Sequence, residues 1–243
     1  MHGRLARSLL SLVVPPLCVA CREPELSGAP VCPGCALGME VIGPCCCRCG
    51  APAPCTSAAC PECRGRGLAF ERAWAPFAYT GSAREVVLGL KGGGLTAATT
   101  YMAGAIARRA PPGLLGGILV PAPPHPARMR RHGHNQARAM AEALGRVAGL
   151  PLRDVLARRP GGRPQVGLER HARRVNARGG IVVRAEPAGA TPVVLVDDVY
   201  TTGSTLDACA AALRAAGSGP VTAVCFARTV RASTAVAGSP GAA

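Results

Sequence analysis

The chain has 243 residues, of which 49% are hydrophobic and 3% aromatic, and its formal net charge is +15 at pH 7. This length allows one large domain, or a mid-sized domain with a small appendage. So few aromatic residues disfavour a protein that reads nucleic acid by stacking successive bases. The charge favours anionic ligands such as phosphate, pyrophosphate or nucleic acid. Because Lys91 is the only lysine among 28 basic residues, a general bias toward arginine and a solvated surface explains the charge equally well.

The N-terminal segment combines Arg4 and Arg7 with a short apolar run at 9–14 that ends at Pro15 and Pro16. The run is shorter than the apolar core of most signal peptides, and no small-residue cleavage pattern follows it. No other segment approaches the roughly 20 apolar residues that span a bilayer. We therefore expect a short N-terminal helix, no membrane span and a cytoplasmic location.

Cysteines dominate the first quarter of the chain, where eight of them form four C-x-x-C pairs that repeat after 28 residues. The pairs are Cys18/Cys21 and Cys32/Cys35, followed by Cys46/Cys49 and Cys60/Cys63. Two thiolates at this spacing can face one ion, and two such turns complete a tetrahedral four-cysteine zinc site. The spacing predicts a double zinc ribbon over residues 1–68 with two structural Zn sites. A disulfide framework is the weaker alternative, because it needs an oxidising compartment.

The consecutive cysteines 45–47 leave one zinc ligand open, since only the repeat selects Cys46. The pairs can also combine sequentially or cross between the two repeats. A module with so few large apolar residues depends on metal binding for most of its stability. Its expected role is to dock a partner or the neighbouring domain rather than to perform chemistry.

Strand and helix patterns alternate after the cysteine-rich module. A strand is predicted over 73–79, helices over 82–91 and 96–109, and a buried strand over 117–120. A loop rich in arginine leads to a helix over 135–149 that buries Met140, Leu144 and Val147. A strand over 193–196, a helix over 204–216 and a strand over 221–226 complete the pattern.

Alternating strands and helices predict an α/β domain with a parallel sheet over residues 69–235, in which ligands bind beyond the carboxyl ends of the strands. The last residues, 236–243, are predicted to form a disordered tail, because 237–243 consist only of Gly, Ser, Pro and Ala.

The clearest functional pattern is a buried strand that ends in two carboxylates and then runs through a hydroxyl-rich turn into a helix. Its residues are Asp197, Asp198, Thr201, Thr202, Gly203, Ser204 and Thr205. Free N–H groups and the positive dipole end at the start of a helix attract phosphate, the glycine allows close approach, and the hydroxyls add donors. The carboxylates suit the hydroxyl groups of ribose, which donate hydrogen bonds. The pattern predicts a ribose 5-phosphate site.

This block resembles the phosphoribosyl pyrophosphate signature of type I phosphoribosyltransferases. The chain as a whole is similar to the ComF (ComFC) family, which is associated with DNA uptake in competent bacteria. The resemblance includes the paired cysteine knuckles, the stretches 79–85, 120–123 and 131–137, Leu90-Lys91, and a pattern from Gln165 to Asn176. His134 and Ile181 depart from it, because both stand where the family usually has an aromatic residue.

The resemblance implies a type I phosphoribosyltransferase fold, with Asp197 and Asp198 on the ribose and residues 201–205 on the 5-phosphate. It also implies Mg and basic groups that hold the pyrophosphate, namely Arg128, Arg131 and Lys91. Further candidate site residues are Asn135, Gln136, Arg173 and Asn176.

The expected activity is transfer of a phosphoribosyl group, a pentosyl transfer, from phosphoribosyl pyrophosphate or a similar ribose phosphate to an unknown acceptor. The alternative is a non-catalytic sensor of such a ligand, or a scaffold for single-stranded DNA whose zinc module docks proteins of the DNA-uptake machinery.

Overall fold

The computed structural model describes residues 16–54, 60–90, 95–124, 129, 133–159, 180–185 and 189–230. The predicted N-terminal helix and C-terminal tail lie outside these residues, as do the candidate ligands Lys91, Arg128, Arg131, Arg173 and Asn176. Within the described residues, no helix combines the length and the apolar character that crossing a membrane requires.

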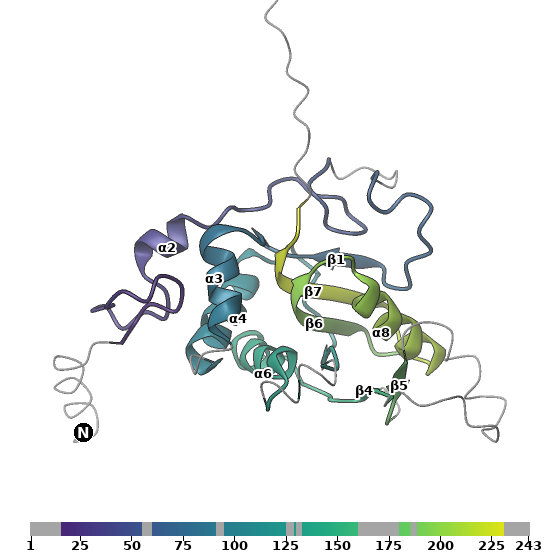
Figure 1. The fold of residues 1–243 in the computed structure, drawn as a ribbon. Coiled ribbons are helices and arrows are strands. Elements are labelled where there is room, and N and C mark those ends of the chain that lie inside the picture. The colour runs from purple at the N-terminus through teal and green to yellow at the C-terminus, as the bar shows by residue number, and fades with distance from the viewer. Residues whose placement is uncertain are drawn as a thin grey trace, which may run out of the picture.

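A parallel sheet forms the centre of the α/β domain, in the order β1-β7-β6-β3, with β2 also paired to β7 (Figure 1). Its strands are β1 (Arg72–Trp74), β2 (Phe77–Ala78), β3 (Ile118–Pro121), β6 (Val193–Tyr200) and β7 (Val221–Arg228). Each of the pairings within this sheet is parallel. The two central strands, β6 and β7, are buried along most of their length because both faces of the sheet are covered. The predicted parallel α/β architecture is confirmed.

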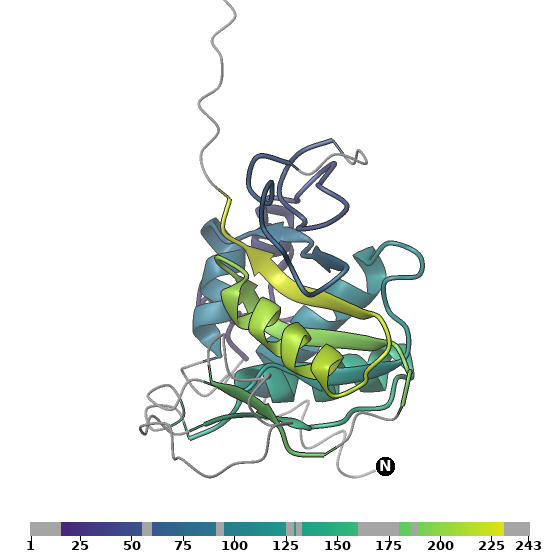
Figure 2. The ribbon, with the colours of Figure 1, turned by 90° about the vertical axis from the view of Figure 1, so that its right-hand side faces the viewer.

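Helices cover the two faces of the sheet. They are α3 (Gly81–Gly89), α4 (Leu95–Arg109) and α6 (Gln136–Ala148) on one face and α8 (Ser204–Ala215) on the other. Figure 2 shows the yellow-green α8 in front of the sheet, with the bluer helices behind it. Successive side chains of a strand point to opposite faces, so Val194 and Val196 join the core under α4 and α6, whereas Val193 and Leu195 join the core under α8.

Three predicted elements differ from the structure. The strand predicted over 193–196 continues to Tyr200, so Asp197 and Asp198 lie within β6. The strand predicted over 73–79 is divided into β1 and β2 by the residues around Pro76, which lacks the N–H group that a sheet ladder requires. In α6, Met140 and Leu144 are fully buried as predicted, but Val147 is 54% exposed. The helix continues beyond its packed stripe, so its last turn faces solvent.

A small antiparallel sheet that no sequence pattern predicted joins β4 (Leu156–Arg158) to β5 (Ile181–Val183). It is separate from the parallel sheet. The segment that leads into β4 is hydrogen-bonded to β3, since the Arg153 N–H donates to the carbonyl oxygen of Leu119 at 2.9 Å. This sheet therefore carries its side chains close to the carboxyl end of β3.

The cysteine-rich module consists of two ribbons, which we call the first ribbon (residues 16–43) and the second ribbon (residues 44–54 and 60–68). Their backbone hydrogen bonds repeat at positions 28 residues apart. The Cys18 N–H donates to Glu23 O, and the Cys46 N–H to Ala51 O, at 2.8 Å in both ribbons. The repeat in the sequence is therefore also a repeat in the structure.

The two ribbons pack against different parts of the α/β domain. The first ribbon, which includes α2 (Pro33–Leu37), lies against α3. Val19 of this ribbon contacts Gly89 of α3 so closely that a side chain at position 89 would overlap it. The second ribbon shares a core with Phe70, Tyr200 and Leu206. It thus lies at the end of β6 and the beginning of α8.

Candidate functional site

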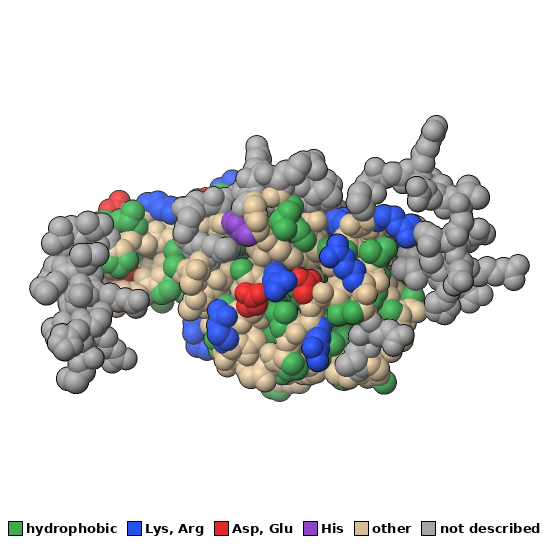
Figure 3. Space-filling view, turned by 90° about the horizontal axis from the view of Figure 1, so that it is seen from below, with side chains coloured by type: hydrophobic (Ala, Val, Ile, Leu, Met, Phe, Trp, Pro, Cys, Tyr) green, Lys and Arg blue, Asp and Glu red, His purple; other side chains and the backbone are tan. Residues whose placement is uncertain are grey.

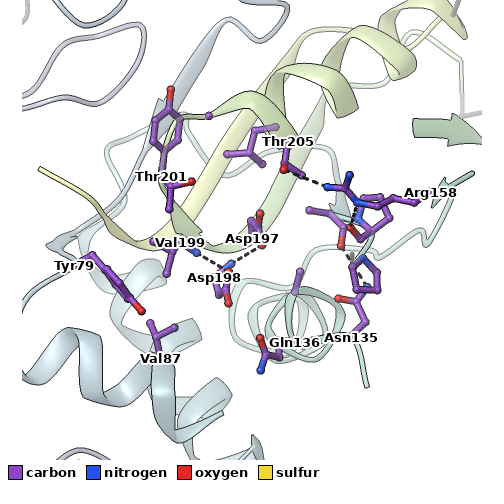
Figure 4. A pocket seen from close by; sticks show the side chains of 17 residues that line it. Tyr79, Val87, Asn135, Gln136, Arg158, Asp197, Asp198, Val199, Thr201 and Thr205 are labelled. Carbon is purple, nitrogen blue, oxygen red and sulfur yellow. Dashed lines mark hydrogen bonds between the residues drawn. The ribbon is translucent and has the colours of Figure 1, made fainter. Parts of the chain in front are cut away.

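A cavity of about 310 Å³ lies beyond the carboxyl ends of β3 and β6 (Figure 4). This volume is at the lower end of the range for small-molecule sites. Its wall is built from the end of β6, the turn that follows it, the start of α6, and the segment after β3. The predicted location for a ligand, beyond the ends of adjacent parallel strands, coincides with this cavity.

The two carboxylates of the motif both line the cavity. Asp198 is 7% exposed, and Asp197 is partly buried. One oxygen of Asp197 accepts the Asp198 N–H at 2.9 Å, and one oxygen of Asp198 accepts the Val199 N–H at 2.8 Å. Local backbone bonds thus fix both side chains at the edge of the sheet, and a carboxylate held in this way retains acceptor capacity for further donors.

The hydroxyl-rich turn divides into residues that face the cavity and residues that do not. Thr201, Gly203 and Thr205 line the cavity. Thr202 and Ser204 are exposed outside that lining, and their hydroxyl groups lie 2.9 Å apart in a mutual hydrogen bond.

Gly203 is required by the shape of this turn. Its φ of 75° lies in the left-handed region, and a Cβ atom added there would overlap the ring and hydroxyl of Tyr200. The glycine therefore lets the chain turn directly from the end of β6 into α8. The first N–H groups of α8, the positive end of its dipole, are thereby placed at the cavity.

Arg158, which the sequence analysis missed, brings a positive charge into the cavity. It stands at the end of β4, and its Nη2 donates to the hydroxyl of Thr205 at 3.2 Å. Its Nε donates to the carbonyl oxygen of Pro123 at 3.3 Å. Among the described residues that line the cavity, it is the one with a cationic side chain. The guanidinium thus bridges the segment after β3 and the start of α8.

The predicted candidates Asn135 and Gln136 both line the cavity, with different roles. Asn135 caps α6, since its side-chain oxygen accepts the Arg138 N–H and its amide nitrogen donates to Ala122 O, each at 3.3 Å. Gln136 is 3% exposed, and its Nε2 makes no hydrogen bond within the part of the chain that the structure describes. A buried amide donor beside a cavity can serve a bound ligand.

Tyr79 and Val87 line the end of the cavity opposite Arg158 (Figure 4). Tyr79 opens a stretch that takes part in the family resemblance, but neither residue was selected as a site residue from the sequence. Val87 and the ring of Tyr79 give this end apolar surface beside one phenolic hydroxyl, whereas carboxylates, hydroxyls and the guanidinium lie elsewhere in the lining.

The eight paired cysteines form two groups, and the grouping is sequential. In each group the four sulfur atoms lie within 4.8 Å of one another, and the members are Cys18, Cys21, Cys32 and Cys35, then Cys46, Cys49, Cys60 and Cys63. Cys46, which only the repeat had selected, is the member of its consecutive run that joins a group.

These donor sets fit a zinc ion. Tetrahedral zinc with Zn–S bonds of about 2.3 Å places its sulfur ligands about 3.8 Å apart. The Sγ atoms of Cys46 and Cys63 are 3.8 Å apart, and those of Cys21 and Cys32 are 3.9 Å apart. Both separations are far too long for a disulfide bond.

The thiol of Cys46 is prepared for metal binding by its backbone surroundings. Burial opposes its ionisation, but the backbone hydrogen bonds that the sulfur receives outweigh burial and lower its pKa to about 6. The same balance at Cys18 in the first ribbon gives a pKa of about 6. The thiolate is therefore favoured at Cys18 and at Cys46 near neutral pH, and the thiolate is the form that binds metal.

The chain matches no protein-family model, and a search of curated proteins finds no match. Solved structures similar to it include glutamine phosphoribosylpyrophosphate amidotransferase from B. subtilis complexed with ADP and GMP, with a TM-score of 0.39. Another is described as the allosteric regulatory enzyme of purine biosynthesis, with a TM-score of 0.37. Each is 18% identical over 53% of this chain, which spans only 26% and 25% of their respective lengths. The likeness concerns the fold alone.

Proposed function

We propose that the cavity binds the ribose 5-phosphate group of phosphoribosyl pyrophosphate or a similar ligand. The observation that carries the proposal is that Asp197 and Asp198 share one cavity with the start of α8 and with Arg158. The 5-phosphate binds at residues 201–205, where N–H groups, hydroxyls and the guanidinium are available as donors. The ribose hydroxyls donate to the two carboxylates.

The pyrophosphate end of the ligand requires further positive charge. The resemblance to type I phosphoribosyltransferases assigns it to Arg128, Arg131 and Lys91, with Arg173 and Asn176 as additional candidates. The carboxylates of Asp197 and Asp198 are hard oxygen donors of the kind that Mg²⁺ prefers, and a bound Mg²⁺ would neutralise charge on the leaving pyrophosphate.

In the proposed transfer reaction, the bond between the ribose C1 atom and the pyrophosphate oxygen breaks, and the bonding electrons leave with the pyrophosphate. The ribose then carries positive charge, which Asp197 and Asp198 stabilise because they are fixed beside it. An incoming nucleophile forms the new bond to C1, and its proton passes to the departing pyrophosphate or to solvent. The end of the cavity at Tyr79 and Val87 is available to the acceptor.

We propose that the two cysteine groups hold structural zinc ions. The sulfur separations and the all-thiol donor set support this assignment. The resemblance to the ComF family adds a role in DNA uptake as part of the proposal. On the face drawn in Figure 3, basic side chains are scattered rather than gathered into one patch. Arg138 is paired with Glu142 and Asp154. We therefore centre the proposal on the ribose phosphate ligand.

Isothermal titration calorimetry with phosphoribosyl pyrophosphate and Mg²⁺, together with an assay for released pyrophosphate, tests this function. We expect the paired substitution Asp197→Asn and Asp198→Asn to abolish binding without unfolding the protein. Asp154→Asn is the matched control, because Asp154 pairs with Arg138 outside the cavity. Unchanged affinity in the paired variant contradicts the site assignment. Release of pyrophosphate identifies an enzyme, whereas binding without release is expected both of a sensor and of a transferase that lacks its acceptor.

A further inference from the structure

The second ribbon contacts the turn that we assign to the 5-phosphate. The Nη2 of Arg66 donates a hydrogen bond of 2.8 Å to the carbonyl oxygen of Thr202. Three residues later, the Ala69 N–H donates a bond of 2.7 Å to the carboxylate of Asp207, in the first turn of α8. The segment that follows the last zinc ligand therefore holds the turn both before and after the start of the helix.

A buried arginine links the same ribbon to the end of β6. Arg228 is 2% exposed, its Nη1 donates to Cys49 O at 2.6 Å, and its Nη2 pairs with Glu62 at 2.5 Å. Its guanidinium lies 4.1 Å from the centre of the Tyr200 ring. Tyr200 in turn occupies the space above Gly203. A chain of direct contacts thus runs from the cysteine knuckle to the glycine of the ligand turn.

Charged groups restrict the movement of the residues in this series of contacts. Removing the carboxylate from a buried guanidinium leaves an uncompensated charge, so Glu62 fixes the position of Arg228. A cation over an aromatic ring is attracted to its face, so Arg228 fixes Tyr200. Because the ring is in contact with the turn, movement of the knuckle is transmitted to the turn.

The repeat provides a comparison within the same chain. Both ribbons contain Cys-Pro-x-Cys, and the variable residue is Gly34 in the first and Glu62 in the second. Three residues after the last cysteine stand Gly38 in the first ribbon and Arg66 in the second. Both ribbons form a four-cysteine group, so the group itself requires neither Glu62 nor Arg66. These two residues serve a contact that only the second ribbon makes.

We propose that the second ribbon is a positioning element of the ligand site, and that Arg66 and Glu62 are its positioning residues. Neither residue lines the cavity. They act by holding residues 200–207 in the shape that presents the helix N-terminus and Thr205 to a phosphate. The affinity of the site for ribose phosphate therefore depends on the second ribbon and not on the first. This inference rests on the proposed function for the identity of the ligand.

The test combines calorimetry with ribose 5-phosphate and hydrogen–deuterium exchange of the amides at 202–207. We expect Arg66→Ala to lower the affinity roughly fivefold and to speed exchange in this segment, because a charge-assisted hydrogen bond is lost. Arg66→Lys keeps a charged donor and should recover part of both effects. Glu62→Gln, like Arg66→Ala, should lower the affinity and speed the exchange of these amides. Arg64→Ala is the matched control, since Arg64 is exposed in the same ribbon.

Zinc content and thermal unfolding are measured for each variant, and both should stay close to those of the unaltered protein for Arg66→Ala. Equal affinity and equal exchange in Arg66→Ala, Arg64→Ala and the unaltered protein would overturn the proposal. If the unaltered protein fails to bind ribose 5-phosphate, the proposed function fails. The exchange data then still decide whether Arg66 and Glu62 position the turn.

Discussion

The guanidinium of Arg158 is placed to bind the phosphate that we assign to residues 201–205. It already bonds to the hydroxyl of Thr205 at 3.2 Å. Arg158→Ala removes this charge from the cavity. We expect the affinity for ribose 5-phosphate, measured by calorimetry, to fall roughly tenfold, which corresponds to about 1.4 kcal/mol.

A second variant at this position separates charge from geometry, and a variant at Arg153 is the control. Arg158→Lys keeps the charge but loses the planar fork, so it should recover only part of the affinity. Arg153→Ala should bind like the unaltered protein, because Arg153 is exposed before the same strand and does not line the cavity. If Arg158→Ala binds as tightly as Arg153→Ala, then Arg158 has no part in the site.

The residues of the site differ in how far the sequence predicts them. Asp197, Asp198 and the turn that follows need only one strand, one turn and one helix, so a single segment contains the whole pattern. Arg158 lies 35 residues from Pro123 and 47 from Thr205, and it reaches them through a separate small sheet. No local pattern encodes such a contact.

At the scale of elements, α8 lies between two glycines that can be compared directly. Gly203 before the helix has a φ of 75° and Gly217 after it has a φ of 85°, so alanine is strained at both positions by about 1 kcal/mol. Only at Gly203 would the added Cβ overlap a neighbour, the ring of Tyr200, whereas open space surrounds Gly217. The additional free-energy cost of alanine at Gly203 therefore comes from distortion of the turn that we assign to the ligand.

We expect Gly203→Ala to lower the free energy of unfolding by roughly 2–3 kcal/mol and to weaken ribose 5-phosphate binding at least about tenfold. Gly217→Ala should cost about 1 kcal/mol and leave the affinity unchanged. Denaturant unfolding and calorimetry provide the two measurements. Equal affinity in the two variants would show that the turn tolerates a side chain at 203 and that its shape does not govern binding.

Long elements with a regular pattern were predicted well, and short or interrupted ones were not. Burial on both faces makes the apolar runs of β3, β6 and β7 easy to recognise in the sequence. The division of the first predicted strand at Pro76 depends on one missing N–H group inside an otherwise suitable run. The strands of the β4–β5 pair have three residues each, too few to show an alternating pattern.

At the scale of the whole molecule, the cysteine spacing predicted two equivalent ribbons, and the structure gives them different surroundings. The first ribbon packs on α3, and the second packs against the end of β6 and the start of α8. Docking is decided by side chains outside the cysteine pattern, such as Glu62 and Arg66, whose partners come from distant parts of the chain. The repeat alone cannot reveal this difference.

The same difference predicts the order in which the two ribbons lose the zinc ions that we propose for them. In the first ribbon Cys21 is exposed, whereas each of the four cysteines of the second group is buried. A chelator must reach the ion to remove it, so a colorimetric chelator should release zinc in two phases of about one ion each, the faster from the first ribbon. Cys21→Ser should abolish the fast phase and spare the slow one, and Cys49→Ser, at the matching position of the repeat, should do the reverse. Release in a single phase, or loss of the slow phase in Cys21→Ser, contradicts independent sites of unequal access.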